Sequence, residues 1–420
     1  MKTHQNRSNL LLFILISVIF IMPACQKDTG NHVVYMQWGD PREVEITRTL
    51  LKEFENRNPD IKVDVIHATD YHTKLNTMLA GGTPPDVFYV SANDFLHYAK
   101  RDVLLNLEPY IERDRKELNM KDFYPKLLSV FTYNGALYGI PKDFTTAVLY
   151  YNKDMFDEAG VSYPDDSWDW DKLVSIARKL TKEKGMAGFK QYGIDPGFEY
   201  SLFIYQNDGR IMNEDRTRCI IDEPASVEAV RFFADLKNKY HVAPTAVEAA
   251  DSPVGLEVRG SAMCIGGRWL VPRFRRITKF KWDVAHLPRG KKRSTLIYTV
   301  CYSISRKCKH PENAWKLVKF LTGPEGQAMQ SRLGLAIPSR RSVAESDAFF
   351  DGKPPENTRV YLDAMDYARF LPYFPQWVEA RHKMDNHLEQ VWTGKKSPEK
   401  GCKEAADAVN QLLKETQAGQ

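Results

Sequence analysis

The chain has 420 residues, of which 43% are apolar and 12% aromatic, so its composition excludes a disordered or fibrous protein. Its length suits two lobes better than one. The 59 basic residues barely exceed the 54 acidic ones, so the charge does not require a nucleic-acid partner. The six cysteines form no CxxC pair and no Cys/His cluster. We therefore expect neither a metal site nor a cofactor.

The N-terminus has the pattern of an export signal. Lys2 and Arg7 precede an apolar run over residues 10–22, which is shorter than the about 20 residues of a membrane-spanning helix. The run ends in Met22-Pro23-Ala24-Cys25, which resembles a bacterial lipobox with atypical first and second residues. That resemblance implies that Cys25 becomes the first mature residue and carries acyl chains that anchor the protein to a membrane outside the cytoplasm. The alternative is an ordinary signal peptide cut nearby.

Five cysteines remain after Cys25, and an odd number leaves at least one free thiol in an oxidising compartment. If the segment between Cys301 and Cys308 is extended, their Cα atoms stand about 23 Å apart, beyond disulfide reach. We expect buried thiols that pack as small apolar residues. The sequence leaves open whether any disulfide forms among Cys219, Cys264, Cys301, Cys308 and Cys402.

Strands and helices alternate from residue 33 onward. Asp40 is placed as an N-cap, with Pro41 at the first helical position and Glu43 three residues after the cap. We expect strands at 33–38, 61–66 and 86–90, and helices at 41–54 and 71–79. This βαβαβ unit predicts a parallel sheet covered by helices.

The rest of the chain continues the alternation and contains no internal repeat. We expect strands at 147–151, 262–265 and 299–305. We expect three helices that begin near 168, 224 and 311, and further helical stretches at 361–392 and 397–413. The fold class expected from this order is α/β, with two lobes joined at several points.

Several sequence strings in a fixed order carry a family resemblance. After the lipobox come GTPPDVFYV at 82–90, LYGIPKDFTTAVLYYNKDMF at 137–156, GSAMCIGGRW at 260–269, a segment at 285–327 that begins AHLPRGKKRS, and LGLAIPSR at 333–340. Together they resemble the family 1 extracellular solute-binding proteins of ABC transporters, the maltose-binding-protein-like group. The resemblance spans nearly all of the mature chain.

This resemblance implies a type II periplasmic-binding-protein-like fold, in which two α/β lobes share a multi-crossover hinge and hold the ligand cleft between them. It implies a signal peptide at 1–24, a tether at 25–32, an N-terminal lobe at 33–141 plus 292–337, and a C-terminal lobe at 142–291 plus 338–420. A ligand closes such a hinge by binding the closed form better than the open form. The expected protein is a monomer that captures a mono- or oligosaccharide and delivers it to the transmembrane subunits of an ABC permease, with no catalytic step.

The ligand site in the first lobe can be predicted without the family. Ligands of open parallel sheets bind outside the carboxyl ends of the strands. This rule selects Gln37, Trp38 and Asp40 after the first strand, and Ser91, Asn93 and Asp94 after the third. Carboxylates and amides hydrogen-bond to hydroxyls, and an indole offers a flat apolar face to a sugar ring. These residue types therefore favour a neutral polyol.

The alternative roles of these residues are structural. Asp40 also fits as a helix cap alone, Asp94 as the cap of a helix that begins near Phe95, and Asn93 as a turn residue. Asp86, beside a proline at a strand start, fits a structural role better than a binding one.

In the second lobe, the family resemblance places a sugar-stacking aromatic at Trp269, and Gly266 and Gly267 allow the backbone to approach a ligand. The alternative is a core tryptophan. Weaker candidates that match the family are Asp143, Glu199, Tyr200, Tyr298, Tyr373, Phe374 and Trp377. Because an aromatic stripe is more often core than site, we expect only one or two of the last three to contact ligand.

The same residue types are also found in proteins with other functions. A secreted carbohydrate-active enzyme also needs carboxylates and aromatics in a cleft, but no acid–base pair at a fixed spacing is evident. Tyr150-Tyr151 resembles the paired tyrosines of iron-binding relatives, yet adjacent strand residues point to opposite faces. Phosphorylated polyols and polyamines stay open as ligands.

The arginines near Trp269 and the basic run at 289–293 are interpreted as a solvated face or a docking surface for the permease. A sharper hypothesis pairs Arg268 with an acidic saccharide. The sequence does not identify the sugar, its permease, or the membrane that carries the anchor.

Overall fold

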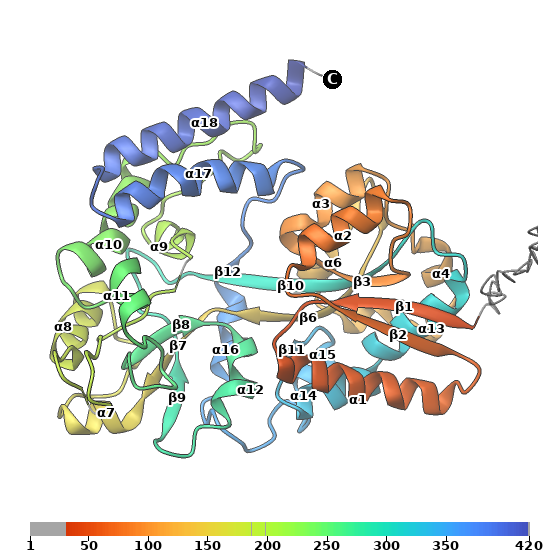
Figure 1. Ribbon diagram of the computed structural model, residues 1–420, viewed down its shortest axis with the longest axis horizontal. Helices are drawn as coiled ribbons and strands as arrows, with labels where there is room; N and C mark the ends of the chain where they lie inside the picture. Colours follow the sequence, from red (N-terminus) through yellow and green to blue (C-terminus); the bar gives the residue numbers. More distant parts are fainter. Residues whose placement is uncertain (1–30, 186, 198, 419–420) are drawn as a thin grey trace, which may run out of the picture.

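The computed structural model describes residues 31–185, 187–197 and 199–418. The export segment and Cys25 lie outside these residues. The strands are β1 His32–Gln37, β2 Lys62–His67, β3 Val87–Ser91, β4 Thr132–Tyr133, β5 Ala136–Leu137, β6 Ile140–Thr146, β7 Val148–Asn152, β8 Met263–Gly266, β9 Trp282–Ala285, β10 Thr295–Ile304, β11 Ile337–Pro338 and β12 Ala368–Arg369 (Figure 1).

The α-helices are α1 Pro41–Arg57, α2 Tyr71–Ala80, α3 Ala92–Lys100, α4 Glu108–Arg113, α5 Arg115–Leu118, α6 Pro125–Val130, α7 Lys153–Glu158, α8 Trp170–Leu180, α9 Ser201–Gln206, α10 Pro224–Asn238, α11 Ala246–Asp251, α12 Val271–Phe274, α13 Pro311–Thr322, α14 Pro324–Arg332, α15 Arg341–Ala344, α16 Val360–Asp363, α17 Trp377–Trp392 and α18 Pro398–Ala418. Short 3₁₀ helices are η1 Met120–Asp122, η2 Arg268–Leu270 and η3 Ala364–Asp366.

The larger sheet has the strand order β11-β6-β10-β3-β1-β2, with β12 paired to β10. Strand β1 pairs in parallel with both β2 and β3, which confirms the βαβαβ unit predicted from the sequence. Strand β10 joins β3 and β6 in antiparallel fashion, so a strand from late in the chain lies at the centre of the first lobe. We call this sheet and helices α1–α6 and α13–α15 the first lobe.

The smaller sheet has the order β8-β7-β9, and both of its strand pairs are antiparallel. Helices α7–α10, α17 and α18 lie around it and form with it what we call the second lobe (Figure 1). The mixed α/β architecture with two lobes confirms the predicted fold class. The exact lobe boundaries given above stay a prediction.

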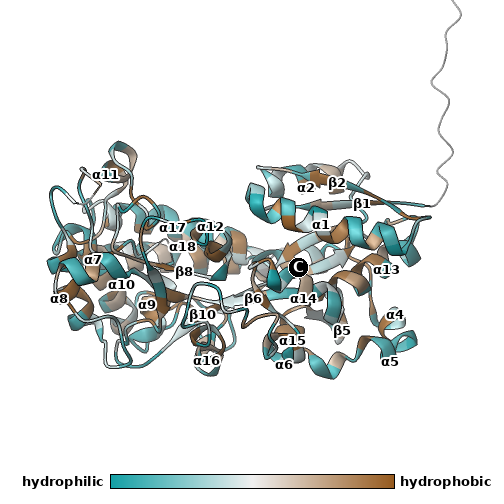
Figure 2. Cartoon of the chain, turned by 90° about the horizontal axis from the view of Figure 1, so that it is seen from below, coloured by the Kyte–Doolittle hydropathy of each residue, from teal (hydrophilic) through white to brown (hydrophobic). Residues whose placement is uncertain are grey.

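Two adjacent strands connect the lobes. Figure 2 shows β6 and β10 passing between the two bodies of the chain. Strand β6 ends at Thr146 and β7 begins at Val148, so the first crossing is a single residue. That residue, Ala147, donates its amide to the Leu296 carbonyl at 3.1 Å and accepts from the Thr295 hydroxyl at 2.6 Å. The crossing is therefore a paired ribbon and not a loose linker.

The continuous helix expected at 361–392 is wrong. Helix α16 ends at Asp363, the short elements η3 and β12 follow, and an irregular segment then runs from residue 370 to the start of α17 at Trp377. Pro372 and Pro375 lie in that segment, and a proline supplies no backbone N–H to a helix. The prolines place the aromatic residues of this segment on a loop between the lobes.

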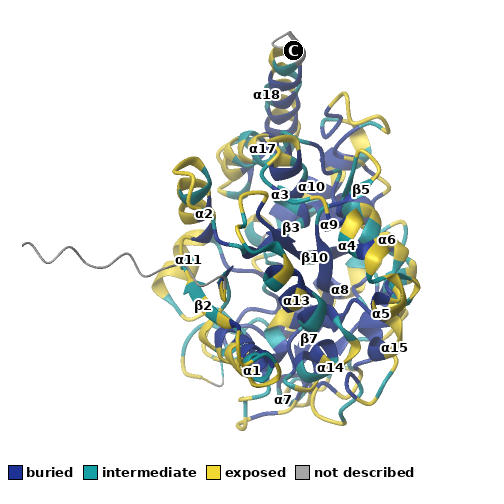
Figure 3. Cartoon of the chain, turned by 90° about the vertical axis from the view of Figure 1, so that its right-hand side faces the viewer, coloured by how far each residue is buried: buried dark blue, intermediate teal, exposed yellow. Residues whose placement is uncertain are grey.

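The interior of each lobe is apolar and buried, as Figure 3 shows for β3, β7 and β10 inside their helices. The cysteines after Cys25 are all free thiols, and four are buried. Burial raises the pKa of each of them, so they remain protonated at neutral pH. Across residues 31–418, apart from the two undescribed positions, no helix has the length and apolar character needed to span a membrane.

Candidate functional site

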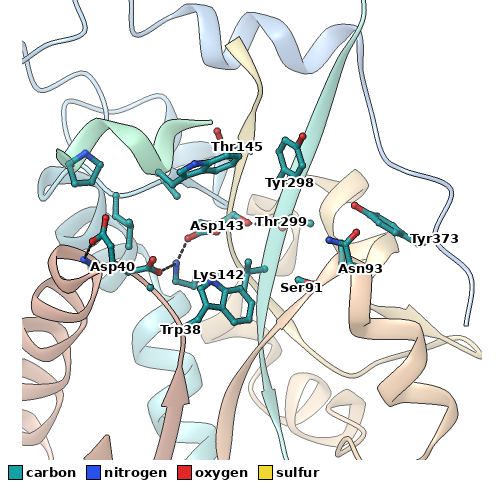
Figure 4. Close-up of a pocket in the computed structure, with 18 residues that line it drawn as sticks. Trp38, Asp40, Ser91, Asn93, Lys142, Asp143, Thr145, Tyr298, Thr299 and Tyr373 are labelled. Carbon is teal, nitrogen blue, oxygen red and sulfur yellow. Dashed lines mark hydrogen bonds and ion pairs between the residues drawn. The ribbon is translucent and has the colours of Figure 1, made fainter. Parts of the chain in front are cut away.

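A cavity of about 370 Å³ opens where the two lobes meet. Its volume falls in the range of about 300–1,000 Å³ that is usual for small-molecule sites. The predicted site residues that line it are Trp38, Asp40, Ser91, Asn93, Asp143, Trp269, Tyr298 and Tyr373. Figure 4 shows members of this set arranged around a common space. The structure therefore brings together side chains that lie up to 335 residues apart in the sequence.

The first-lobe residues reach the cavity because they follow strands β1 and β3. Trp38 comes directly after β1, Ser91 is the last residue of β3, and Asn93 lies in the first turn of α3. The two strands are parallel, so their carboxyl ends meet at one edge of the sheet. The sheet topology alone positions this half of the cavity.

Asp40 lines the cavity and also has a structural role, whereas Asp94 has a structural role only. Asp40 Oδ1 accepts the backbone amides of Arg42 at 2.8 Å and Glu43 at 2.9 Å, so it is the N-cap of α1 and also lines the cavity. Asp94 does not line the cavity, and it accepts a hydrogen bond from the Ser91 hydroxyl at 2.5 Å. The expectation that Asp94 caps α3 is wrong, because α3 begins at Ala92 and Asp94 lies inside its first turn. Asp86 accepts the Val34 amide at 2.8 Å, which fits its structural interpretation.

The two tryptophans of the cavity differ in exposure. Trp38 is half-buried and packs edge-on against Tyr71 and Tyr89, with ring centroids 4.8 and 5.1 Å apart. Trp269 is 37% exposed and meets Tyr298 edge-on at 5.3 Å. A side chain at Gly267 would place its Cβ 2.1 Å from the Trp269 ring, so only glycine permits this orientation. Trp269 is thus not a core residue, and its free face borders the cavity.

A buried charged cluster of Glu43, Lys142 and Asp143 also lines the cavity. The Lys142 ammonium pairs with Asp143 Oδ2 and lies 3.5 Å from Glu43 Oε1 and 4.9 Å from the centre of the Tyr89 ring. Burial lowers the pKa of Lys142, but the neighbouring Asp143 and Glu43 outweigh burial and hold that pKa above its ordinary value. Burial raises the pKa of Asp143 and of Glu43 against the pull of Lys142. The ammonium therefore stays charged at neutral pH.

Sequence reasoning missed Lys142, Glu43, Thr145 and Thr299, which all line the cavity. Glu43 had been identified only as the third residue after a helix cap. The Lys-Asp pair after Pro141 is atypical of a buried strand, since charged residues are seldom fully buried. The two signals that pointed to this cluster were the family-matched candidate Asp143 and the capping position of Glu43.

Other predicted residues lie outside this cavity. Gln37 is fully buried and accepts the Tyr35 hydroxyl at 3.1 Å. Phe374 and Trp377 are buried, and the Trp377 indole N–H donates to Asn93 Oδ1 at 3.2 Å, which links α17 to α3 across the lobes. Of the late aromatic residues, only Tyr373 lines the cavity.

Glu199 and Tyr200 belong to a polar network of the second lobe. Glu199 accepts from the Arg381 guanidinium at 3.1 and 3.2 Å, and the Tyr200 hydroxyl donates to Asp385 at 3.1 Å. Glu199 also lines a second cavity of about 180 Å³, which shares Trp269 and Tyr298 with the first. Trp269 therefore stands between two adjoining spaces.

Arg268 does not face the cavity, although its neighbour Trp269 does. It is fully buried, and its Nη1 donates to the carbonyl oxygens of Gly334, Leu335 and Ala336 at 2.9, 3.3 and 3.1 Å. Burial lowers the pKa of its guanidinium to about 10. This position contradicts the hypothesis that Arg268 pairs with an acidic saccharide. Its N–H groups instead hold the chain segment that enters β11.

The basic run at 289–293 is compensated by acidic neighbours. Lys291 pairs with Glu228 at 2.7 Å, Arg293 pairs with Asp166 at 2.8 Å, and Lys292 contacts Asp208.

The Tyr150 hydroxyl donates to the Gly267 carbonyl at 2.7 Å and accepts from the Tyr361 hydroxyl, so this tyrosine is structural. Within the described part of the chain, no three His, Cys, Asp or Glu side chains are grouped to hold a metal ion.

Comparisons with known proteins point to one family. The sequence profile of a family described as bacterial extracellular solute-binding protein matches residues 49–354. An ABC substrate-binding protein from Listeria monocytogenes, solved in complex with cycloalternan, is 29% identical with a TM-score of 0.84, covering 91% of this chain and 99% of that one. A solute-binding protein from Thermotoga lettingae bound with α-D-tagatose is 24% identical with a TM-score of 0.81, covering 91% and 100%. The arabinooligosaccharide-binding protein of Bacillus subtilis is 24% identical over 335 residues, which are 75% of this chain and 76% of that protein.

Proposed function

The chain belongs to the bacterial extracellular solute-binding proteins, and from that premise we propose that it captures a carbohydrate for an ABC importer and releases it unaltered. The observation that carries the proposal is the inter-lobe cavity with Trp38 on one lobe and the exposed face of Trp269 on the other. Indole faces pack against the C–H side of a sugar ring. The polar groups around them suit hydroxyls, since the Asn93 amide N–H can donate, and the Thr145 and Thr299 hydroxyls, which donate to backbone carbonyls, can still accept.

Capture works by hinge closure in this proposal. A ligand held by Trp38 and Trp269 contacts both lobes at once, so it stabilises the arrangement in which the two surfaces approach each other. The paired strands β6 and β10 restrict the motion to a bend and resist free rotation of the lobes. The closed form is the one that the transmembrane subunits of the importer then receive.

The proposed location is outside the cytoplasm, with the mature protein a monomer anchored through acylated Cys25. The proposed tether at 25–32 precedes the rest of β1 in the sequence. Two or more acyl chains make such an anchor stable. Phase partitioning in detergent tests the anchor: the protein expressed from the full sequence enters the detergent phase, and the Cys25→Ser variant stays in the aqueous phase. Equal partitioning of the two proteins would exclude the anchor.

A thermal-unfolding screen against a saccharide panel tests the function. A ligand at a hundredfold excess over Kd stabilises the native state by about 2.7 kcal/mol, which raises the unfolding midpoint measurably. Amino acids and inorganic anions serve as control compounds in the same screen. After incubation, chromatography of the stabilising saccharide should return it unchanged. New hydrolysis products would favour a carbohydrate-active enzyme, and an unshifted midpoint across the whole panel would reject the carbohydrate proposal.

A further inference from the structure

The lining of the cavity contains the charged cluster of Glu43, Lys142 and Asp143. Lys142 is the one basic residue among those that line the cavity in the described chain, and its side chain is only 4% exposed. Glu43 and Asp143 line the same cavity, with side chains 15% and 10% exposed. With all three groups ionised, the cluster carries two negative charges against one positive charge.

The geometry directs the ammonium at protein groups. Asp143 Oδ2 contacts Lys142 Nζ and also accepts the Gln330 amide at 3.5 Å, which fixes the carboxylate. Glu43 Oε1 lies 3.5 Å from the ammonium on the side of α1, and the Tyr89 ring faces it at 4.9 Å. An anionic solute that approached Lys142 would meet both carboxylates at close range.

We propose that Glu43 and Asp143 set the selectivity of the cavity. Because their carboxylates pair with the Lys142 ammonium, the cavity admits uncharged solutes and excludes anionic ones. A neutral polyol keeps its binding affinity in this arrangement, since carboxylate oxygens accept strong hydrogen bonds from hydroxyls. A phosphate or carboxylate group is instead placed beside like charges, which disfavours its binding at a desolvated site. The inference rests on the proposed function, because it specifies the class of solute that the same cavity accepts.

A graded charge series tests the proposal with inorganic phosphate as the probe. Calorimetric titrations at low ionic strength compare the wild-type protein with Glu43→Gln, Asp143→Asn and the double variant. The cluster charge rises in steps of one along this series, from a net negative value to the single positive charge of Lys142. We expect no saturable phosphate binding by the wild type, and at least tenfold tighter binding by the double variant than by either single variant.

Asp40→Asn is the matched control, because Asp40 lines the same cavity but belongs to the cap of α1 and makes no ion pair with Lys142. This variant removes one negative charge from the cavity and leaves the cluster intact. We expect it to bind phosphate no better than the wild type. An equal gain in Asp40→Asn and Asp143→Asn would refute the role of the cluster, because overall charge would then explain the selectivity.

The remaining outcomes also decide the question. Saturable phosphate binding by the wild type, or none by a folded double variant, overturns the proposal. If the double variant fails to fold by circular dichroism, a gain in phosphate affinity in folded Glu43→Gln or Asp143→Asn supports it, and the absence of a gain in both rejects it. The phosphate titrations require no sugar, so a saccharide panel without any hit would remove the proposed function and leave the charge series interpretable.

Discussion

The exposed indole of Trp269 gives the sharpest prediction for ligand affinity. The 37% of its surface that is exposed corresponds to about 90 Å², taking about 250 Å² for a whole tryptophan. A sugar that covers this face gains about 2 kcal/mol at about 25 cal/mol per Å². Trp269→Ala should therefore weaken saccharide binding about thirtyfold, measured by calorimetric titration with the compound that shifts the unfolding midpoint most.

Two controls separate stacking from structural damage. Trp269→Phe keeps a smaller ring and should lose less affinity than the alanine variant. Trp168→Phe changes a buried tryptophan that does not line the cavity, so it should lower the unfolding midpoint and leave the affinity unchanged. An unchanged Kd in Trp269→Ala, with native circular dichroism, would refute the claim that a ligand packs on this face.

Further predictions concern groups around the site and on the second lobe. Asp40→Ala removes the acceptor of two backbone amides at the start of α1 and should lower the free energy of unfolding in urea by about 1 kcal/mol. Arg268→Met leaves three carbonyl oxygens without their donor and should cost about 1–3 kcal/mol in the same assay, while competition titrations show the same preference between acidic and neutral saccharides as in the wild type. Burial raises the pKa of Glu248, but hydrogen bonds from the Thr245 amide and Lys190 outweigh burial and lower the pKa from 4.5 to about 2. The charged form of Glu248 therefore stabilises the fold above pH 4.5. Glu248→Gln should therefore destabilise the protein at pH 7, and the difference from the wild type should shrink as the pH falls from 4.5 toward 2.

Local patterns predicted the first part of the fold well. The Asp40-Pro41 start of α1 was correct, because a cap and a proline act over only a few residues. The rule that ligands bind at strand carboxyl ends led to Trp38, Ser91 and Asn93, which all line the cavity. These features depend on residues that are close to one another in the sequence, so they can be predicted from one sequence alone.

Features that depend on distant partners could not be predicted in this way. Strand β6 was not predicted, because a proline and two charged residues at 141–143 are atypical of a buried strand. Two distant residues stabilise this strand. Glu43, which is 99 residues away in the sequence, forms an ion pair with Lys142, and the Ser339 hydroxyl donates to the Pro141 carbonyl at 2.6 Å. Likewise, the burial of Trp377 against α3 involves Asn93, which is 284 residues away in the sequence.

A crystal structure of the protein saturated with its best saccharide tests the central claim most directly. We expect the sugar in the cavity between the lobes, with one ring against the free face of Trp269 and hydroxyls within hydrogen-bonding distance of Asn93 or Asp143. A saccharide bound elsewhere on the molecule, with the cavity occupied only by water, would contradict the account.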